Sequence, residues 1–250
     1  MEVVAIISRK GGVGKTATAQ ALGAGLIRKG FSVLYIDLDS QTNLSYALGA
    51  DINGVTSMDV LTQEATAPEA IQHTPQGDAI PADKDLAGAD IVITDKRKEY
   101  RLRDALEAVK SVYDYIVIDT PAALGTLTIN ALTAADSVII PVQAEIYSLQ
   151  GMAQLNETIE TVRKYCNHNL QIQGILITRH NGRAVISRDM QSNLQEAADH
   201  LHTRLYSTPV RECISIKEAQ YAQRDIFSYA PRSNAAKDYA VFVNEFLERK

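Results

Sequence analysis

Long hydrophobic runs and paired cysteines are both missing from this 250-residue chain. No apolar run approaches the ~20 residues that a membrane-spanning helix needs. Residues 1–7 contain no charged segment, apolar stretch or cleavage site of a secretory leader. Cys166 and Cys213 are isolated, with no Cys-x-x-Cys or Cys/His spacing, which argues against a disulfide framework or a metal site. These absences predict a cytoplasmic protein with reduced cysteines.

Excess positive charge is also lacking, since the net charge is −5. That value argues against a protein that coats nucleic acid with its whole surface. The charge is unevenly spread, however: residues 1–170 hold 14 basic and 21 acidic side chains, whereas residues 171–250 hold 11 and 9. The last third therefore offers a basic face for a polyanion, although ordinary solvated surface charge gives the same distribution.

What the chain does have is a glycine-rich loop at residues 8–18, Ser-Arg-Lys-Gly-Gly-Val-Gly-Lys-Thr-Ala-Thr. It follows an apolar run at residues 3–7 and precedes an Ala/Leu-rich helical stretch over residues 16–29, the strand–loop–helix context of a phosphate-binding loop. The glycines let backbone N–H groups approach an anion at the helix N-terminus. Lys15 is then expected to reach the β- and γ-phosphates, and the Thr16 hydroxyl to ligate Mg²⁺. A glycine-rich turn without a ligand is the alternative.

The loop departs from the common pattern G-x-x-x-x-G-K-[ST], because Arg9 occupies the position of the first glycine. It also contains a second lysine, Lys10, where one is sufficient. A solvent-exposed lysine that only raises the local potential is the simpler interpretation of Lys10.

The remaining pattern predicts an α/β fold. Apolar, β-branched runs at residues 32–36, 115–118, 137–141 and 172–177 alternate with helical patterns at about residues 102–111, 149–165 and 187–202. Such alternation is typical of a single domain built on a mostly parallel, twisted sheet with helices on both faces. Residues 78–82 are a further candidate strand in the less regular region 49–100. The stretch 233–250 has helical spacing and mixed charge, which favours a docked terminal helix over a membrane-targeting one.

Two of the predicted strands end in acids, in Tyr-Ile-Asp37-Leu-Asp39 and Tyr-Ile-Val-Ile-Asp119-Thr-Pro. An acid that follows a buried apolar run is costly unless it serves a cation or a hydrogen-bond network. Asp also commonly begins a loop, but the phosphate loop upstream favours a Mg²⁺-nucleotide site for both segments.

The sequence Lys-Gly-Gly-Val-Gly-Lys-Thr at residues 10–16 resembles the deviant Walker A box of the ParA/MinD family of ATPases, a P-loop NTPase-like fold. The resemblance implies that Lys10 crosses a dimer interface to the partner's ATP, much as an arginine finger does. By the same match Asp39 orients the attacking water, Asp37 supports hydrated Mg²⁺, and Asp119 holds Mg²⁺ through water. Ser40, Ala122 and Ala17 differ from the residues usual in the family.

The resemblance extends along the chain. Residues 141–145, Pro-Val-Gln-Ala-Glu, and the segments 208–211 and 215–219 are similar to the ParA/Soj branch. It implies that Glu145 lies near the nucleotide and the dimer interface and that Pro209 lies by the adenine, although an ordinary surface glutamate and loop proline fit almost as well. The nucleotide-binding set expected from the match comprises Lys10, Gly11, Gly12, Val13, Gly14, Lys15, Thr16, Ala17, Glu145 and Pro209, with Lys10, Lys15 and Asp39 catalytic and with Thr16, Asp37 and Asp119 at the metal.

The function implied is that of an ATPase that dimerises with ATP and Mg²⁺, binds double-stranded DNA without sequence preference and segregates a plasmid, chromosome or mobile element. A ParB-type centromere-binding partner would stimulate its otherwise slow hydrolysis. The protein would then be cytoplasmic and would associate with the nucleoid when ATP-bound, without a membrane partner. The DNA-contacting candidates are Arg183, Arg188, Arg211 and Lys217.

Other classes are weaker matches. A MinD-like, membrane-cycling regulator of cell division is the main alternative, and the predicted terminal helix disfavours it. An iron–sulfur reductase needs ligating cysteines after Asp119, and none lies before Cys166. An enzyme that uses ATP to activate a carboxylate shares the fold, but no substrate-binding residues are visible. Since the loop begins so early, residues 1–250 are expected to form one ATPase domain without an N-terminal helix-turn-helix.

Overall fold

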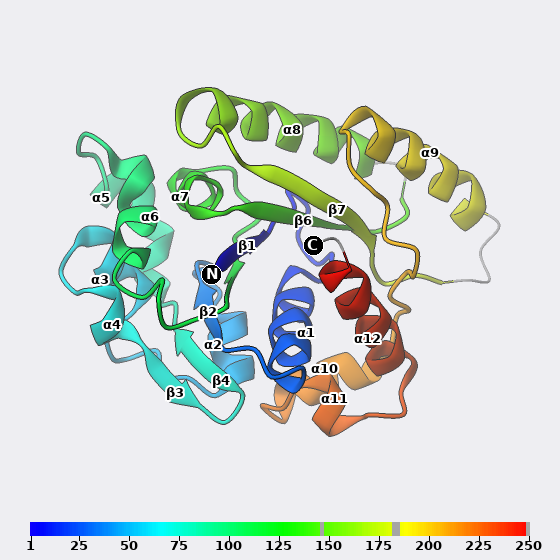
Figure 1. Cartoon of the computed structure of the whole chain (residues 1–250), viewed down its shortest axis with the longest axis horizontal. Coiled ribbons are helices and arrows are strands. Elements are labelled where there is room, and N and C mark those ends of the chain that lie inside the picture. The colour runs from blue at the N-terminus through cyan, green and yellow to red at the C-terminus, as the bar shows by residue number, and fades with distance from the viewer. Residues whose placement is uncertain (146–147, 182–185, 249–250) are drawn as a thin grey trace.

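A computed structural model describes residues 1–145, 148–181 and 186–248, with side chains over the same ranges except 148–150 and 186–191. Within this part of the chain, seven strands form one sheet in the order β3-β4-β2-β5-β1-β6-β7 (Figure 1). All neighbouring strands are parallel except the edge pair β3 and β4. The strands are β1 (Glu2–Ile6), β2 (Val33–Asp37), β3 (Gln72–Thr74), β4 (Gly77–Ile80), β5 (Tyr115–Asp119), β6 (Ser137–Val142) and β7 (Gln171–Ile177).

Helices cover both faces of this sheet, as predicted. They are α1 (Lys15–Arg28), α2 (Asn43–Leu48), α3 (Ser57–Thr62), α4 (Ala67–Ala70), α5 (Ala89–Val92), α6 (Arg101–Leu106), α7 (Thr126–Ala134), α8 (Ser148–Tyr165), α9 (Ile186–His200), α10 (Ile214–Tyr221), α11 (Ile226–Tyr229) and α12 (Asn234–Leu247), with the short 3₁₀ turns η1 (Lys84–Gly88) and η2 (Lys98–Tyr100).

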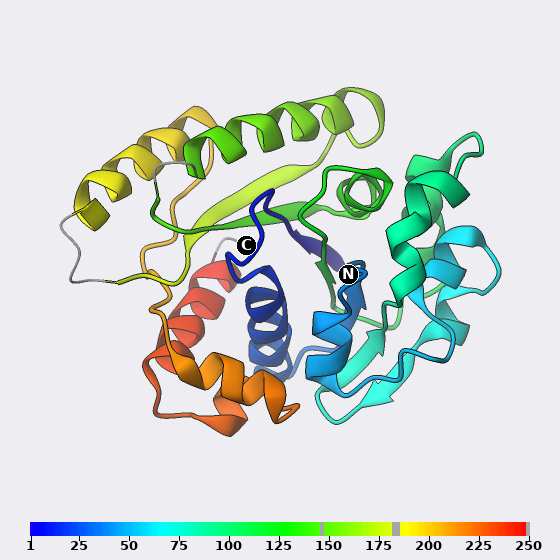
Figure 2. The same ribbon diagram turned by 180° about the vertical axis from the view of Figure 1, so that it is seen from behind.

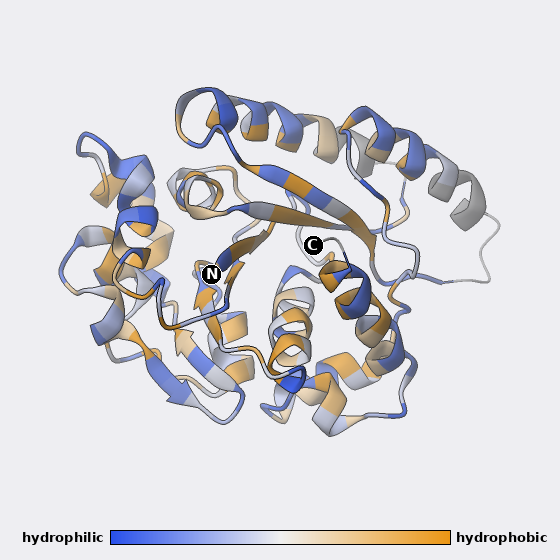
Figure 3. Cartoon of the chain, viewed as in Figure 1, coloured by the Kyte–Doolittle hydropathy of each residue, from blue (hydrophilic) through white to orange (hydrophobic). Residues whose placement is uncertain are grey.

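The sheet separates two hydrophobic cores, because successive residues of a strand face opposite sides. On β1, Val3 and Ala5 belong to the core shared with α3–α9, whereas Val4 and Ile6 belong to the core shared with α1, α2 and α10–α12. Figure 3 shows the central strands in hydrophobic colours and both colours along α8, as expected for a sheet buried on both faces and a helix buried on one. This confirms the predicted fold class.

Helix α1 packs closely against β2 on one side and against α12 on another. A Cβ added at Gly23 would lie 2.2 Å from the Cε1 atom of Tyr35 on β2, and one at Gly25 would lie 2.6 Å from Cγ2 of Val243 on α12. Only glycine fits either contact. Figure 2 shows the dark blue loop that joins β1 to this helix, so the loop is held between a buried strand and a closely packed helix.

The predicted terminal helix is a docked one: α12 buries Tyr239, Phe242 and Phe246 against the core that it shares with α1. Two expectations were less accurate. The helix predicted over residues 102–111 ends at Leu106 and continues as turns. In residues 49–100 the candidate strand at 78–82 is confirmed as β4, but its partner β3 and the short helices were not predicted; β3 and β4 form a hairpin closed by Gly77 at φ 124°.

Candidate nucleotide site

The glycine-rich loop begins directly after β1 and ends where α1 starts. Gly12 and Gly14 have φ angles of 75° and 87°, in the left-handed region that favours glycine. Val13, between them, is 1% exposed, and its carbonyl oxygen accepts a 2.6 Å hydrogen bond from the hydroxyl of Thr178, just after β7. The loop is therefore held at the carboxyl ends of two strands, β1 and β7. The N-terminus of α1 is available to an anion.

Lys15 points inward at the start of α1. It is 7% exposed, and burial lowers the pKa of its ammonium group, while Asp119 and Asp39 act in the opposite direction. The next residue, Thr16, donates a 2.6 Å hydrogen bond from its hydroxyl to Oδ2 of Asp119. The phosphate-binding and metal-binding residues predicted from the sequence are thus brought together.

Asp37 and Asp119 are register partners at the carboxyl ends of β2 and β5. They are 1% and 0% exposed, and burial first, then the nearby charge of Asp37, raises the pKa of Asp119 well above its usual range. Oδ1 of Asp119 is buried and has no hydrogen-bond partner among the described residues. An unpaired buried carboxylate oxygen beside a threonine hydroxyl fits Mg²⁺, which binds oxygen ligands and retains waters.

The neighbouring acids hold the next loop in place. Asp37 accepts hydrogen bonds from the backbone N–H of Asp39, at 3.0 Å, and from the N–H and hydroxyl of Ser45, at 2.9 and 2.7 Å. These bonds anchor α2 to the end of β2. Asp39 is less buried and accepts from the N–H of Gln41 at 3.0 Å.

A cavity of ≈ 760 Å³ opens in front of the loop, between α2 and α10. Its volume lies within the range of ~300–1,000 Å³ typical of ligand pockets. The predicted residues that line it are Gly11, Gly12, Gly14, Lys15, Thr16, Ala17, Asp39 and Lys217. The lining residues that sequence reasoning did not assign include Tyr46, Thr178, Arg179, Glu212, Cys213 and Tyr239.

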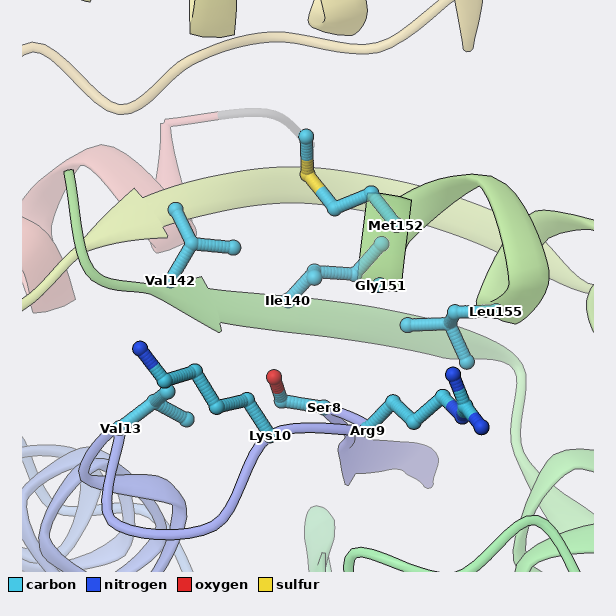
Figure 4. A pocket seen from close by; sticks show the side chains of 9 residues that line it. All are labelled: Ser8, Arg9, Lys10, Val13, Ile140, Val142, Gly151, Met152 and Leu155. Atoms are coloured by element: carbon cyan, nitrogen blue, oxygen red, sulfur yellow. The ribbon is translucent and has the colours of Figure 1, made fainter. Parts of the chain in front are cut away.

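Lys10 takes a different direction from Lys15. Its ammonium group forms an ion pair with Glu145, which follows β6, and the two side chains are 38% and 52% exposed. A small cavity of ≈ 20 Å³ lies beside it, between the loop and α8. Figure 4 shows Lys10 and Arg9 leaving the loop in different directions at this cavity, with Met152 and Leu155 of α8 opposite. The predicted pairing of Lys10 with a second subunit remains a prediction.

Arg179 extends the site in a way that the sequence analysis did not identify. Its guanidinium donates to the carbonyl of Gly12 at 3.2 Å and to Oε1 of Glu212 at 2.8 Å. With its amide oriented to suit both neighbours, Gln143 accepts from Arg179 at 3.0 Å and donates to Glu145 at 3.0 Å. A polar chain therefore runs from Lys10 across the loop to Glu212. The signal that the sequence analysis did not use was the position of Arg179 two residues after a parallel strand.

The remaining predicted residues lie elsewhere. Pro209 lines a separate hollow of ≈ 350 Å³ with Ile177 and Tyr206, whereas its neighbour Val210 lines the nucleotide cavity. Arg211 forms a bidentate ion pair with Asp238 of α12, in which Nε and Nη2 donate to the two carboxylate oxygens at 2.8 and 2.6 Å. Asp238 is only 5% exposed. Arg183 lies outside the described residues. Arg188 is placed in α9, but its side chain is not described.

The nucleotide site offers few protein ligands to Mg²⁺. In the described part of the chain, no group of three or more His, Cys, Asp or Glu side chains is arranged to hold a metal ion. Magnesium in nucleotide sites is commonly held by one or two carboxylates together with phosphate oxygens, which is what Thr16 and Asp119 offer here. Both cysteines are free thiols, as predicted.

Comparisons with known proteins identify relatives of this chain. A family model described as AAA domain matches residues 1–172. The sporulation initiation inhibitor protein Soj of Bacillus subtilis (strain 168) is 40% identical over 249 residues, 98% of this chain and 97% of Soj. The chromosome partitioning protein ParA of Caulobacter vibrioides (strain NA1000 / CB15N) is 38% identical over 257 residues, 100% of this chain and 95% of that protein.

A solved structure has the same fold. It is described as cobyrinic acid a,c-diamide synthase from Mycobacterium smegmatis with bound ADP and magnesium, and it has a TM-score of 0.86 at 32% identity, covering 100% of this chain and 95% of that one. The fold, the phosphate loop and the paired carboxylates define an α/β ATPase of the P-loop class that uses ATP and Mg²⁺. Within that class, the chain belongs to the family of ParA and Soj ATPases.

Proposed function

We propose that this chain is an ATP-dependent dimerising switch that binds DNA without sequence preference and segregates a plasmid, chromosome or mobile element. The proposal rests on the different environments of two lysines in one loop. Lys15 is buried in the nucleotide cavity, whereas Lys10 lies outside it on an exposed surface. An exposed cation beside the cavity can serve a nucleotide held by another subunit.

Within one subunit, the loop N–H groups and Lys15 would hold the phosphates in line for attack by water. Asp39 lies at the cavity wall, where it would orient that water. Mg²⁺, when bound by Thr16 and Asp119, would neutralise charge on the phosphates. Because this chemistry is mainly positioning and charge stabilisation, hydrolysis is expected to be slow until a second protein completes the site.

Between subunits, Lys10 would leave Glu145 and reach the partner's ATP. The ion pair is exposed, and such pairs contribute only about 0–1 kcal/mol, so a phosphate group can replace the carboxylate at little cost. Glu145 would then remain at the interface. A dimer formed in this way requires ATP in both subunits.

DNA binding would follow from dimerisation. The basic side chains of residues 171–250 are too few for firm binding by one subunit, but two subunits double the phosphate contacts. Arg183, Arg188, Arg211 and Lys217 remain the candidates. The ion pair with Asp238 already engages Arg211, so its contribution would require that pair to open. A ParB-type partner would stimulate hydrolysis and release the dimer.

The protein would be cytoplasmic and would associate with the nucleoid when ATP-bound. None of the helices in residues 1–145, 148–181 and 186–248 is long and apolar enough to cross a membrane. A MinD-like, membrane-cycling role is the main alternative. The docking of α12 through Tyr239, Phe242 and Phe246 favours partition over that alternative, because the apolar face of the helix is already buried.

The test is binding to an arbitrary DNA duplex with ATP, with ADP and without nucleotide, at several salt concentrations. We expect the native chain to bind with ATP alone and more weakly as salt rises, and Lys10→Ala to lose binding. Lys84→Ala, on the exposed turn η1, is the matched control. Binding that ignores the nucleotide, or binding to anionic vesicles and not to DNA, would contradict the proposal.

A second candidate function comes from the M. smegmatis structural neighbour, whose description names an amide-forming synthase. Such an enzyme would use ATP to activate a carboxylate. The chromosome partitioning protein ParA of C. vibrioides is more similar in sequence, at 38% identity, and we therefore favour partition. Hydrolysis of ATP without any organic acid present would separate the two candidates.

A further inference from the structure

A second hollow lies far from the nucleotide site, where the C-terminal end of α1 meets α11 and α12. Its volume is ≈ 440 Å³, again within the range of ~300–1,000 Å³ typical of ligand pockets. Figure 1 shows α1, α11 and α12 side by side, and α1 packs against both of the other helices. Since α1 begins at the phosphate loop and rises 1.5 Å per residue, the hollow lies about 20 Å from the loop.

The floor of this hollow is apolar. It is formed by Phe227 of α11 together with Ala236, Ala240 and Val243 of α12. Gly25 of α1 lies against Val243 and leaves no room for a side chain between the helices. Phe227, Ala236 and Val243 are 8%, 3% and 1% exposed, whereas Ala240 is exposed, so the floor offers a small apolar surface to one side chain of a ligand.

The rim is positively charged. Arg28, Lys29 and Lys237 line it and are exposed, and none of its lining residues is acidic. Arg28 lies over the ring of Phe227, with its guanidinium carbon 5.7 Å from the ring centre. No salt bridge within the described residues involves any of these three cations. On a chain of net charge −5, the hollow is a local concentration of positive charge above an apolar floor.

We propose that this hollow binds an acidic peptide segment of a partner protein. One apolar side chain of the segment would lie against Ala240 and Phe227, and flanking carboxylates would pair with Arg28, Lys29 and Lys237. Peptide recognition commonly combines an apolar anchor with charge complementarity at the rim. The proposal goes beyond the proposed partition function, because it requires neither nucleotide nor DNA.

Duplex DNA is a poorer match for the same surface. Its accessible anions are phosphates on a convex, rigid double helix, and contacts to that backbone are polar. They would leave the apolar floor uncovered. A flexible chain that carries both carboxylate and apolar side chains satisfies both parts of the hollow.

The test uses a display library of random 12-residue peptides, selected against the full chain. The selected peptides are then synthesised with a fluorescent label, and their binding is measured by anisotropy. The hollow is altered by the double substitution Lys29→Glu and Lys237→Glu. Lys84→Glu with Lys96→Glu makes the same change of charge at exposed positions elsewhere. The melting temperature and ATP binding of each variant show that it is folded.

We expect peptides that carry at least two acidic residues around an apolar one, and binding that weakens about tenfold or more in the hollow variant but within twofold in the control. Peptides without an acidic bias, or acidic peptides that both double variants weaken equally, would overturn the proposal. It would also be overturned if the hollow variant lost binding to duplex DNA while the selected peptides still bound it, since the hollow would then belong to a DNA interface.

Discussion

Lys10 and Lys15 belong to the same loop, but their surroundings are opposite. Lys15 is 7% exposed and faces Asp119 and Asp39, whereas the side chain of Lys10 is 38% exposed and is paired with Glu145. The inner side of the loop is dense with buried charge, and the outer side holds an ion pair in water. This difference in surroundings is why we propose that Lys15 serves the protein's own nucleotide and Lys10 a neighbour's.

Removal of the inner lysine should have the largest effect. Lys15→Ala leaves the phosphates without their buried cation, and we expect ATP affinity to fall by about 10³-fold, the upper part of the 2–5 kcal/mol typical of a buried charge pair. Isothermal titration with a non-hydrolysable ATP analogue measures this, with Lys84→Ala as control. Retained affinity would mean that Lys15 does not contact the phosphates.

Removal of the outer lysine, Lys10, should leave ATP binding intact and prevent dimer formation. We expect Lys10→Ala to bind ATP within about threefold of the native chain, because the exposed pair contributes little. The variant should lose the ATP-dependent dimer and about 10³-fold or more of its hydrolysis rate, as when an arginine finger is removed. Light scattering after gel filtration measures the dimer. A variant that still dimerises would show that both lysines serve one subunit.

The buried acid Asp37 on the inner side of the loop should make the stability of the folded protein depend on pH. Burial raises the pKa of Asp37 to about 6 from 3.8, so between these pH values the folded state binds more protons than the unfolded state. The nucleotide-free protein should therefore lose stability as pH rises through this window, by up to about 3 kcal/mol. Denaturant unfolding at several pH values measures the slope. Asp37→Asn should reduce the slope and leave the part that Asp119 contributes, and an unchanged slope in that variant would assign the titration to another group.

A variant of Asp119 can separate two effects of its buried charge, a loss of stability without nucleotide and a gain of stability when MgATP binds. Asp119→Asn removes a buried carboxylate whose Oδ1 has no partner in the described residues. We expect a higher melting temperature without nucleotide, and a loss of about 2 kcal/mol in the stabilisation that MgATP gives. Thermal unfolding with and without MgATP measures both. A fall in both quantities would indicate a structural role for Asp119.

Glu145 should give the smallest change. Glu145→Gln breaks the exposed pair with Lys10, and the free energy of unfolding should change by less than about 0.5 kcal/mol. Because Lys10 is then released, the dimer should form at lower ATP concentrations. A titration of ATP followed by light scattering tests this. Weaker dimerisation in Glu145→Gln would show that the carboxylate of Glu145 supports the dimer and does not restrain Lys10.

The sequence predicted the parts of the site that local patterns encode. The loop at residues 8–18 and the strands that end in Asp37 and Asp119 were identified because glycine spacing and apolar runs are short-range signals. Arg179 and Glu212 were missed because they reach the loop only through the tertiary fold. Likewise, the sequence shows the charge of Arg211 but not its partner Asp238, which lies on a different element.

Apart from β4, which the candidate strand at residues 78–82 identified, the short elements at residues 49–100 were missed for a related reason. Strand β3, for example, is three residues long, too short for a reliable alternation of polar and apolar residues. The helix predicted over residues 102–111 ended early because the residues after Leu106 form turns. Periodicity identifies long buried elements well and short peripheral ones poorly.

The close approach of Gly23 to Tyr35 has a consequence for engineering this protein. Replacing a helical glycine by alanine is a common stabilising choice, worth up to about 1 kcal/mol where space allows. At Gly23 the added methyl would overlap the tyrosine ring, 2.2 Å away, and Tyr35 is fully buried. A consensus or helix-propensity design that ignores this contact would displace the helix that carries Lys15 and Thr16, and would impair nucleotide binding while appearing to improve the scaffold.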